Sequence, residues 1–299
     1  MDAQELAQLK HAGSIAVESI AFARKFIVRG MPLLEIAERI EEHIVQLGGK
    51  PAFPVNLSIN EIAAHATPAL GDTAVARGLL KVDIGVQMEG SIADTAFTLD
   101  LEQLPENAQL IVAAEQALKA AVQFVEQEHA PAIREIGRII ANTITQHHAQ
   151  PVTNLSGHSI ESYEIHAGVT LPNYDNAQEK VLGIGVYAIE PFATERSGAG
   201  QVRDGKMSGI YALVKEGAVR DTFTREVLAY IAEEYRTLPF CTRWLQKKFG
   251  SRVLLSLQRL ETAGLVHQYP QLVEVAGKKV AQAEHTLIIS EKGVQVTTR

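Results

Sequence analysis

Apolar residues recur at helical spacing over two stretches near the start of the chain. The first stretch covers residues 5–27 and ends before Gly30 and Pro32, two residues that stop helices. The second begins at Leu33, keeps its apolar positions three or four residues apart as far as Ile44, and ends before a Gly-Gly pair. We therefore predict two amphipathic helices in succession.

A different period follows, with apolar residues two positions apart from Leu80 to Val86. A Glu-Gly pair at 89–90 then separates this stretch from residues 92–99, which are rich in β-forming residues, so the pattern predicts a β-hairpin. If the turn has two residues, Met88 pairs with Ser91, and this register places Asp94 opposite Gly85.

The order of elements then repeats. Helical periodicity covers 107–127 and 132–147, and Pro105 and Pro131 open these two helices, in the first turn where a missing N–H is tolerated. Residues 152–155, 163–166 and 186–189 read as strands. Helix, helix and strands thus occur twice, and we predict an α+β fold with an internal duplication and a site at the joint of its two halves.

The pattern of apolar and polar residues changes after residue 194. A glycine-rich stretch leads to helical patterns at 221–236, 241–249 and 252–263, and strand character returns over 285–298. We predict a catalytic domain of residues 1–194 plus 276–299, interrupted by a helical, winged-helix-like insert of residues 195–275. We expect the last strand to rejoin the first sheet.

Composition narrows the function classes. The chain has 299 residues and a net charge of −7, with 46% hydrophobic and 21% charged residues, which argues against a nucleic-acid wrapper and against disorder. Its single cysteine leaves no disulfide and no cysteine cluster for a metal. The longest apolar run, residues 181–189, is far shorter than the roughly 20 residues of a membrane helix. With no signal-peptide pattern either, we expect a cytoplasmic protein.

Two carboxylates share one face of the predicted hairpin. Asp83 points away from the apolar face, and Gly85, opposite Asp94, lies on the same side as Asp83. The two acids are then diagonal neighbours about 7–8 Å apart at the backbone. They repel each other unless cations lie between them, and the glycine leaves room there. The competing interpretation is a pair of solvated edge charges.

Further acids and histidines interrupt apolar strand sequence at His158, His166, Glu190 and Glu284. Glu190 closes the most apolar run of the chain, where a carboxylate is costly unless it is paired or bound to metal. Together with the two aspartates of the hairpin, three of these residues form a set of four carboxylates and one imidazole: Asp83, Asp94, His158, Glu190 and Glu284. Such a set suits Mn²⁺, Fe²⁺, Co²⁺ or Zn²⁺, and two divalent ions would cancel its charge.

Four segments also carry a resemblance to a known family. In order and spacing, KVDIGVQMEGSIAD, SGH, IEPFAT and AEHTLIIS resemble the metal-ligand segments of methionine aminopeptidases, which are M24-like metallopeptidases with the pita-bread (creatinase/aminopeptidase) fold. The stretch between Glu190 and Glu284 resembles the helical subdomain of the type II enzymes. The short N-terminus resembles the archaeal form. The resemblance covers nearly the whole chain.

The resemblance implies a role for each ligand position. Asp83 resembles the bidentate ligand of one ion, and Asp94 and Glu284 resemble the bridging carboxylates. His158 and Glu190 resemble ligands of the other ion. Glu190 also resembles the group that takes the proton from the bridging water.

Two histidines and an apolar pocket complete the implied site. His65 and His166 resemble the non-ligand histidines that contact the scissile amide and stabilise the oxyanion. Four further residues match the positions of the methionine pocket: Phe53, Ile165, Phe192 and Tyr269.

The implied function is removal of N-terminal methionine from nascent chains with a small second residue, using two divalent ions (Co, Mn, Fe or Zn). We expect a monomer that uses neither a membrane nor a specific nucleic acid, with the ribosome as a candidate partner. X-Pro dipeptidases share the ligand set but usually carry a separate domain before the first aspartate. Non-catalytic pita-bread binding proteins are the other alternative, and loss of ligands would mark them.

Overall fold

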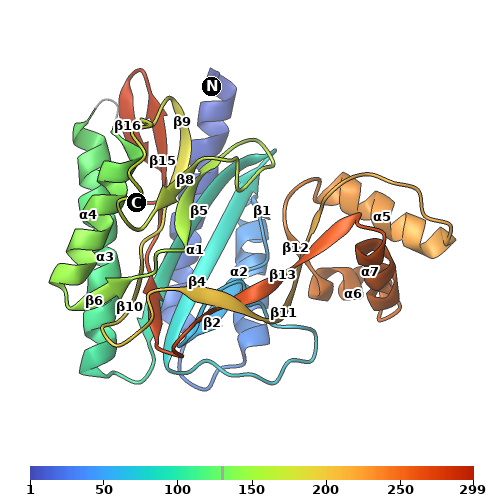
Figure 1. The fold of residues 1–299 in the computed structure, drawn as a ribbon. Coiled ribbons are helices and arrows are strands. Elements are labelled where there is room, and N and C mark those ends of the chain that lie inside the picture. Colours follow the sequence, from blue (N-terminus) through green and yellow to red (C-terminus); the bar gives the residue numbers. More distant parts are fainter. Residues whose placement is uncertain (129–130) are drawn as a thin grey trace.

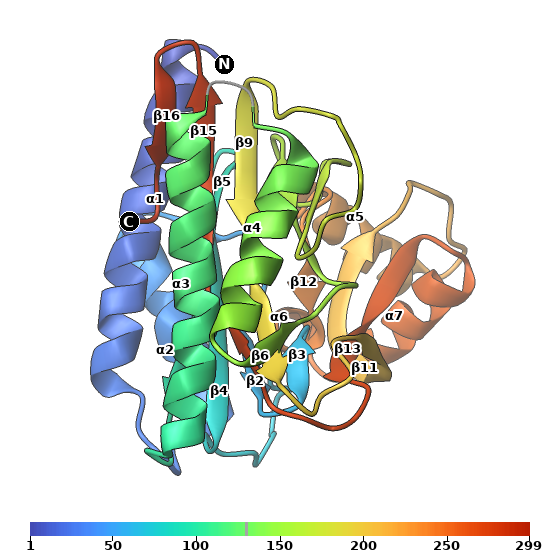
Figure 2. The same ribbon diagram turned by 60° about the vertical axis from the view of Figure 1, so that its left-hand side comes forward.

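Two pairs of long helices cover one side of the antiparallel sheets (Figure 1). The computed structural model describes residues 1–128 and 131–299. The helices are α1 (Ala3–Phe26), α2 (Leu33–Gln46), α3 (Pro105–Gln127) and α4 (Ile133–Gln146). Figure 2, turned by 60°, brings the second pair to the front, with the sheets behind it. The four predicted helices are therefore confirmed.

The first helix pair packs on a four-stranded sheet built around a long hairpin. Its strands are β1 (Lys50–Pro51), β2 (Asn56–Ile59), β4 (Leu79–Met88) and β5 (Ser91–Asp100). The hairpin has the predicted register, since Met88 pairs with Ser91 and Gly85 with Asp94. The apolar face of β4 packs against the stripes of α1 and α2 in one buried cluster.

The second helix pair packs on a five-stranded sheet in the order β16-β15-β9-β7-β8. These strands are β7 (Ser156–Ile160), β8 (Thr170–Pro172), β9 (Gly185–Ile189), β15 (His285–Ser290) and β16 (Gly293–Val296). A separate sheet contains β6 (Ala149–Pro151), β10 (Phe192–Glu195) and β14 (Val280–Gln282). The last long strand, β15, thus pairs in the second sheet and not, as expected, in the first.

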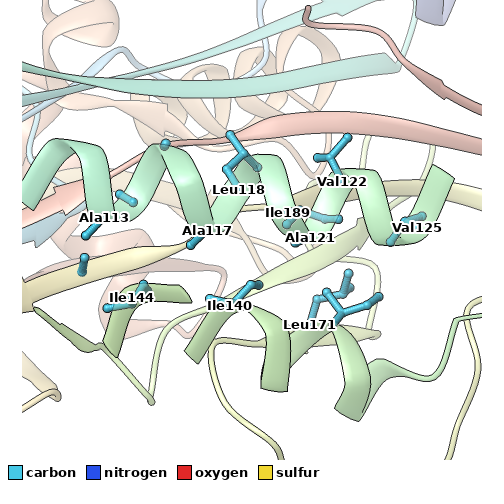
Figure 3. Close-up of a cluster of buried hydrophobic side chains, with 14 of the residues drawn as sticks. Ala113, Ala117, Leu118, Ala121, Val122, Val125, Ile140, Ile144, Leu171 and Ile189 are labelled. Carbon is cyan, nitrogen blue, oxygen red and sulfur yellow. The ribbon is translucent and has the colours of Figure 1, made fainter. Parts of the chain in front are cut away.

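Small residues set the spacing of this second half. Figure 3 shows Ala113, Ala117 and Ala121 of α3 beside Ile140 and Ile144 of α4 in one buried cluster. Alanines on the α3 face let the branched side chains of α4 approach closely, which gives the dense packing typical of protein interiors. Each helix pair therefore has its own apolar core, as an internal duplication requires.

The segment after residue 195 contains long strands as well as helices. The strands β11 (Val202–Leu213) and β13 (Val266–Glu274) pair with each other and with the short β12 (Phe240–Cys241) and β3 (Ile62–Ala64). The helices α5 (Thr222–Glu234), α6 (Thr242–Phe249) and α7 (Val253–Thr262) stand at the right of Figure 1. The division of the chain at residues 195 and 275 stays a prediction.

Three local predictions were wrong. Residues 202–213 form a strand where only a glycine-rich approach to the helices was expected, because Gly205 and Gly209 are accommodated at irregular points of β11. Residues 152–155 and 163–166 are loops, and Tyr163 has a left-handed backbone with φ 58°. In these short runs the apolar side chains are buried by tertiary packing without a paired strand.

None of the helices in the described parts of the chain combines the length and apolar character that a membrane crossing requires.

Candidate functional site

The five predicted ligand residues converge on one cavity of about 430 Å³. Asp83 and Asp94 project from β4 and β5 of the first half. His158 lies on β7 of the second half, Glu190 directly follows β9, and Glu284 directly precedes β15. The joint between the two halves therefore brings together side chains from positions 83 to 284.

The side chains lie within coordination reach of one another. His158 Nε2 is 3.6 Å from Asp94 Oδ2 and 3.5 Å from Glu190 Oε1. Ligand atoms of Asp94, His158 and Glu284 all lie within 4.8 Å of each other. Asp83 faces the same cavity, one diagonal step along the hairpin from Asp94. The predicted grouping of the five residues is thus observed in the structure.

Hydrogen bonds between the halves hold two of these carboxylates in place. The backbone N–H of Asp94 donates to Thr286 Oγ1 at 2.8 Å, and that hydroxyl donates to the carbonyl of Asp94. The N–H of Glu284 donates to the carbonyl of Ala96, and Thr95 Oγ1 donates to the carbonyl of Glu284. The edge of β5 is therefore fixed to the start of β15, and their carboxylates meet at the joint.

Two glycines permit close approaches beside the site. A Cβ on Gly157 would lie 2.2 Å from the carbonyl oxygen of Ala188, so only glycine lets β7 bring His158 this close to β9. A Cβ on Gly85 would lie 2.3 Å from Cε1 of Phe53. The expectation that Gly85 leaves room for cations was therefore wrong, because the glycine makes room for the phenylalanine ring.

Several buried oxygens of the site have no hydrogen-bond partner among the described residues. They are Asp83 Oδ1, Asp94 Oδ1 and both carboxylate oxygens of Glu284. A buried polar atom without a partner is destabilising, and native proteins contain few of them. Their concentration at one point indicates that a bound group satisfies them.

Burial shifts the pKa of every member of this group toward its neutral form. It raises the pKa of Asp83 to about 7, against a smaller lowering by the Gln282 amide. Burial, and then the neighbouring carboxylates, raise the pKa values of Asp94, Glu190 and Glu284 well above their usual range. Burial and His166 lower the pKa of His158 to about 3. The imidazole is therefore neutral near pH 7, and four carboxyl groups share one poorly solvated space.

This donor set fits a divalent metal. Carboxylate oxygens with one neutral imidazole nitrogen are typical ligands of first-row divalent ions, and the single cysteine, Cys241, is not among the described residues that line the cavity. A cation would remove the mutual repulsion that raises the carboxyl pKa values. It would also satisfy the unpartnered oxygens.

The remaining predicted residues surround the same cavity. The ring of His166 lies 4.4 Å from that of His158, in an edge-on arrangement. His65 is edge-on to Tyr269, with ring centroids 5.6 Å apart. Burial and His166 lower the pKa of His65 to about 4. The predicted pocket residues all line the cavity: Phe53, Ile165, Phe192 and Tyr269.

Comparison with known proteins decides the family. The model of "Metallopeptidase family M24" matches residues 7–236. A methionine aminopeptidase of Pyrococcus horikoshii is 45% identical over 300 aligned residues, which cover 97% of this chain and 98% of the relative. The chain belongs to metallopeptidase family M24. A metallopeptidase requires a bound metal ion, and this agrees with the divalent metal inferred from the residues of the cavity.

Solved structures confirm the fold of this M24 chain. A thermophilic Arx1 superposes with a TM-score of 0.83 at 15% identity, covering 99% of this chain and 91% of the other. A methionine aminopeptidase of Thermotoga maritima gives 0.71 at 20% identity, covering 100% and 98%. The predicted pita-bread fold is thus confirmed, and at these identities the likeness concerns the fold alone.

Sequence reasoning missed two polar residues of the M24 site. Gln282 Nε2 donates to Glu190 Oε2 at 3.4 Å. Asn56 pairs with Asp83 in the register of β2 on β4, is buried and lines the cavity. Each could have been recognised as a polar residue in a short strand sequence that is otherwise largely apolar. Asn56 begins the segment NLSI, and Gln282 ends the segment VAQ.

Proposed function

We propose that this chain is a methionine aminopeptidase that hydrolyses the peptide bond after an N-terminal methionine when the second residue is small. The observation that carries the proposal is the convergence of four carboxylates and one neutral imidazole at an apolar-lined cavity. The full-length identity of 45% to a methionine aminopeptidase supports this substrate.

The proposed centre holds two divalent ions, with Co, Mn, Fe and Zn as the candidates. Its ligands are the five predicted residues: Asp83, Asp94, His158, Glu190 and Glu284. Two dications balance the four negative charges of the ionised carboxylates. When bound, such ions polarise a carbonyl group and lower the pKa of water, which makes water a nucleophile at neutral pH.

Glu190 is the proposed proton carrier. It accepts a proton from the water that attacks the scissile carbonyl carbon, and it then delivers that proton to the departing amine nitrogen. The contact from Gln282 Nε2 to one of its oxygens leaves the other oxygen, Oε1, facing His158 and the cavity. The orientation of the carboxylate is therefore set before substrate arrives.

His65 and His166 are the proposed contacts to the scissile amide. Burial lowers the pKa of both rings, so each is neutral near pH 7 and can present one N–H donor without carrying a buried charge. A donor aimed at the carbonyl oxygen strengthens as charge develops on that oxygen in the tetrahedral intermediate. Phe53, Ile165 and Phe192 supply the apolar surface for the methionine side chain.

The alternatives make different predictions. An X-Pro dipeptidase would use the same ligand set, whereas a non-catalytic binding protein of this fold should have lost ligands, and all five positions are filled here. Incubation of the metal-loaded protein with Met-Ala-Ser and with Gly-Pro separates the two enzymes. Release of free methionine supports the proposal, and cleavage of Gly-Pro alone would overturn it.

The biological setting is also proposed. We infer a cytoplasmic monomer that acts on nascent chains and has the ribosome as a candidate partner. Sedimentation of the purified protein measures its oligomeric state. Co-sedimentation with ribosomes tests the partner, and recovery of the protein only in the ribosome-free supernatant would argue against it.

A further inference from the structure

A buried ion pair connects α6 to α2 beside the loop that follows His65. Arg243 is completely inaccessible, and its Nη1 and Nη2 donate to the two carboxylate oxygens of Glu41 at 2.6 and 2.8 Å. Trp244 Nε1 donates to the same carboxylate at 2.8 Å. Such a pair is fixed in geometry, because both charges lose solvent and depend on each other.

The other hydrogen bonds of the pair reach the chain around His65. Arg243 Nε donates to the carbonyl of Pro68 at 3.1 Å, and Arg243 Nη2 lies 3.4 Å from Thr67 Oγ1. The hydroxyl of Thr67 donates to the carbonyl of Val55, at 2.9 Å. The pair therefore holds the loop two and three residues beyond His65.

Glu41 holds the neighbouring segment in the same way. Its Oε1 accepts the backbone N–H of Val55 at 3.2 Å, two residues after Phe53. The Leu57 N–H donates to the carbonyl of Ala66, which joins the two segments directly. One ion pair thus anchors both the histidine and the aromatic ring that face the cavity.

His65 needs this support because its backbone is unfavourable. Its φ of 58° is in the left-handed region, which a non-glycine residue keeps only where its surroundings impose it. Its Nδ1 is buried and has no hydrogen-bond partner among the described residues. The backbone before His65 is held by β3, where Ala64 pairs with Leu272 of β13, and the backbone after it is held by the contacts of Arg243 to Thr67 and Pro68. The ring itself lies edge-on to Tyr269.

We propose that Arg243 and Glu41 are positioning residues, through which α6 holds His65 in its working place. The inference rests on the proposed function, since His65 must act on the substrate for its placement to matter. The proposed metal-ligand residues are on other elements, and within the described part of the chain no hydrogen bond joins them to the pair. Loss of the pair should lower kcat and leave metal binding unchanged.

The test replaces both partners, because removal of one would leave a buried charge. Glu41→Leu with Arg243→Met keeps an apolar volume in place of the pair, a replacement that proteins often tolerate. We expect kcat for Met-Ala-Ser to fall about 10- to 100-fold, the effect of an error of about 1 Å in the placement of an active-site group. Metal affinity, measured by calorimetry, should equal that of the wild type.

A matched control uses a second ion pair between the same two helices. Lys247 of α6 lies 2.8 Å from Glu38 of α2 and is half-exposed, and among the described residues no hydrogen bond joins it to the loop after His65. Lys247→Met should therefore retain wild-type kcat. A fall equal to that of the double variant would mean that any contact between the helices has the same effect, and would overturn the proposal.

The decisive measurement repeats the replacement without His65. If the pair acts through His65, Glu41→Leu/Arg243→Met should have no further effect on kcat in a His65→Ala background. The same 10- to 100-fold fall in that background would show a merely structural role and overturn the proposal, as would an unchanged kcat with His65 present. If the double variant does not fold, Arg243→Lys replaces it in both backgrounds, since lysine lacks the planar fork.

Failure of the proposed function is distinguishable from failure of this inference. If the metal-loaded wild type releases no methionine, the proposed function is wrong. If the wild type is active and the variants behave like it, only the positioning role is wrong.

Discussion

Replacement of Gly85 by alanine should damage substrate binding without altering any of the five proposed metal-ligand residues. The new Cβ would lie 2.3 Å from Cε1 and 2.5 Å from Cδ1 of Phe53, whereas ordinary contacts start at 3.4 Å. The ring must therefore move by about 1 Å or more. Phe53 is 7% exposed and packed among Ile92, Ile165 and other apolar residues, so its easiest path leads into the cavity.

The size of the effect follows from the cost of overpacking. One added methyl group in a packed interior costs about 1–3 kcal/mol. If this cost falls on substrate binding, kcat/KM for Met-Ala-Ser falls about 5- to 150-fold, since about 1.4 kcal/mol is a factor of ten. We expect most of the loss as a higher KM, because the ring lines the proposed methionine pocket and is not a proposed catalytic group.

The assay compares steady-state kinetics of the wild type, Gly85→Ala and Gly85→Ala/Phe53→Leu. The smaller leucine relieves the collision and should recover part of the lost affinity, while Phe53→Leu alone serves as the control. Calorimetric metal affinity should be the same in all four proteins. An alanine variant with wild-type KM and wild-type unfolding temperature would refute this account of Gly85.

Three further outcomes are expected. Asp94→Ala and Glu190→Ala should each give a folded protein without turnover, and near-normal rates in either would mean that the metal site is misplaced. His65→Ala and His166→Ala should lower kcat about 10²-fold or more and keep the wild-type metal content, as expected for lost oxyanion donors; a loss of metal would assign them a different role. The Tm of the metal-free protein should fall as the pH rises from about 6.5 to about 8, and saturating Mn²⁺ should remove this dependence. The sign follows because burial and neighbouring carboxylates raise the pKa values of Asp94, Glu190 and Glu284 well above their usual range, so the folded state keeps protons that the unfolded state has lost. The buried histidines have lowered pKa values and oppose this change, but fewer of their protons remain on the unfolded state as the pH rises past about 6.5. A flat or rising Tm would contradict it.

Local periodicity was sufficient to predict the helices and the hairpin. The register of β4 and β5 follows from a two-residue turn, because strand pairing after such a turn is fixed residue by residue, and Gly85 opposite Asp94 is observed. The same register places Asp83 beside Asp94 on one face of the hairpin. A carboxylate such as Glu190 at the end of an apolar strand is costly without a partner.

Features that depend on distant partners could not be predicted from local pattern. Glu41 reads as one of several acids on an amphipathic helix, and its partner Arg243 is 202 residues away. A glycine at position 85 indicates that a neighbouring group lies close to the backbone there, but only the fold shows that this group is the ring of Phe53. The strand 202–213 was not predicted because its polar and glycine residues interrupt the apolar–polar alternation that is typical of a half-buried strand.

The most direct test of the proposed centre is release of methionine from Met-Ala-Ser by one protein sample before and after metal removal. The proposed function predicts that chelation abolishes the release, and that stepwise addition of Mn²⁺ restores it until two ions are bound per chain. Full activity after metal removal, or saturation of the rate at a single ion per chain, would contradict a two-metal centre built from these five residues.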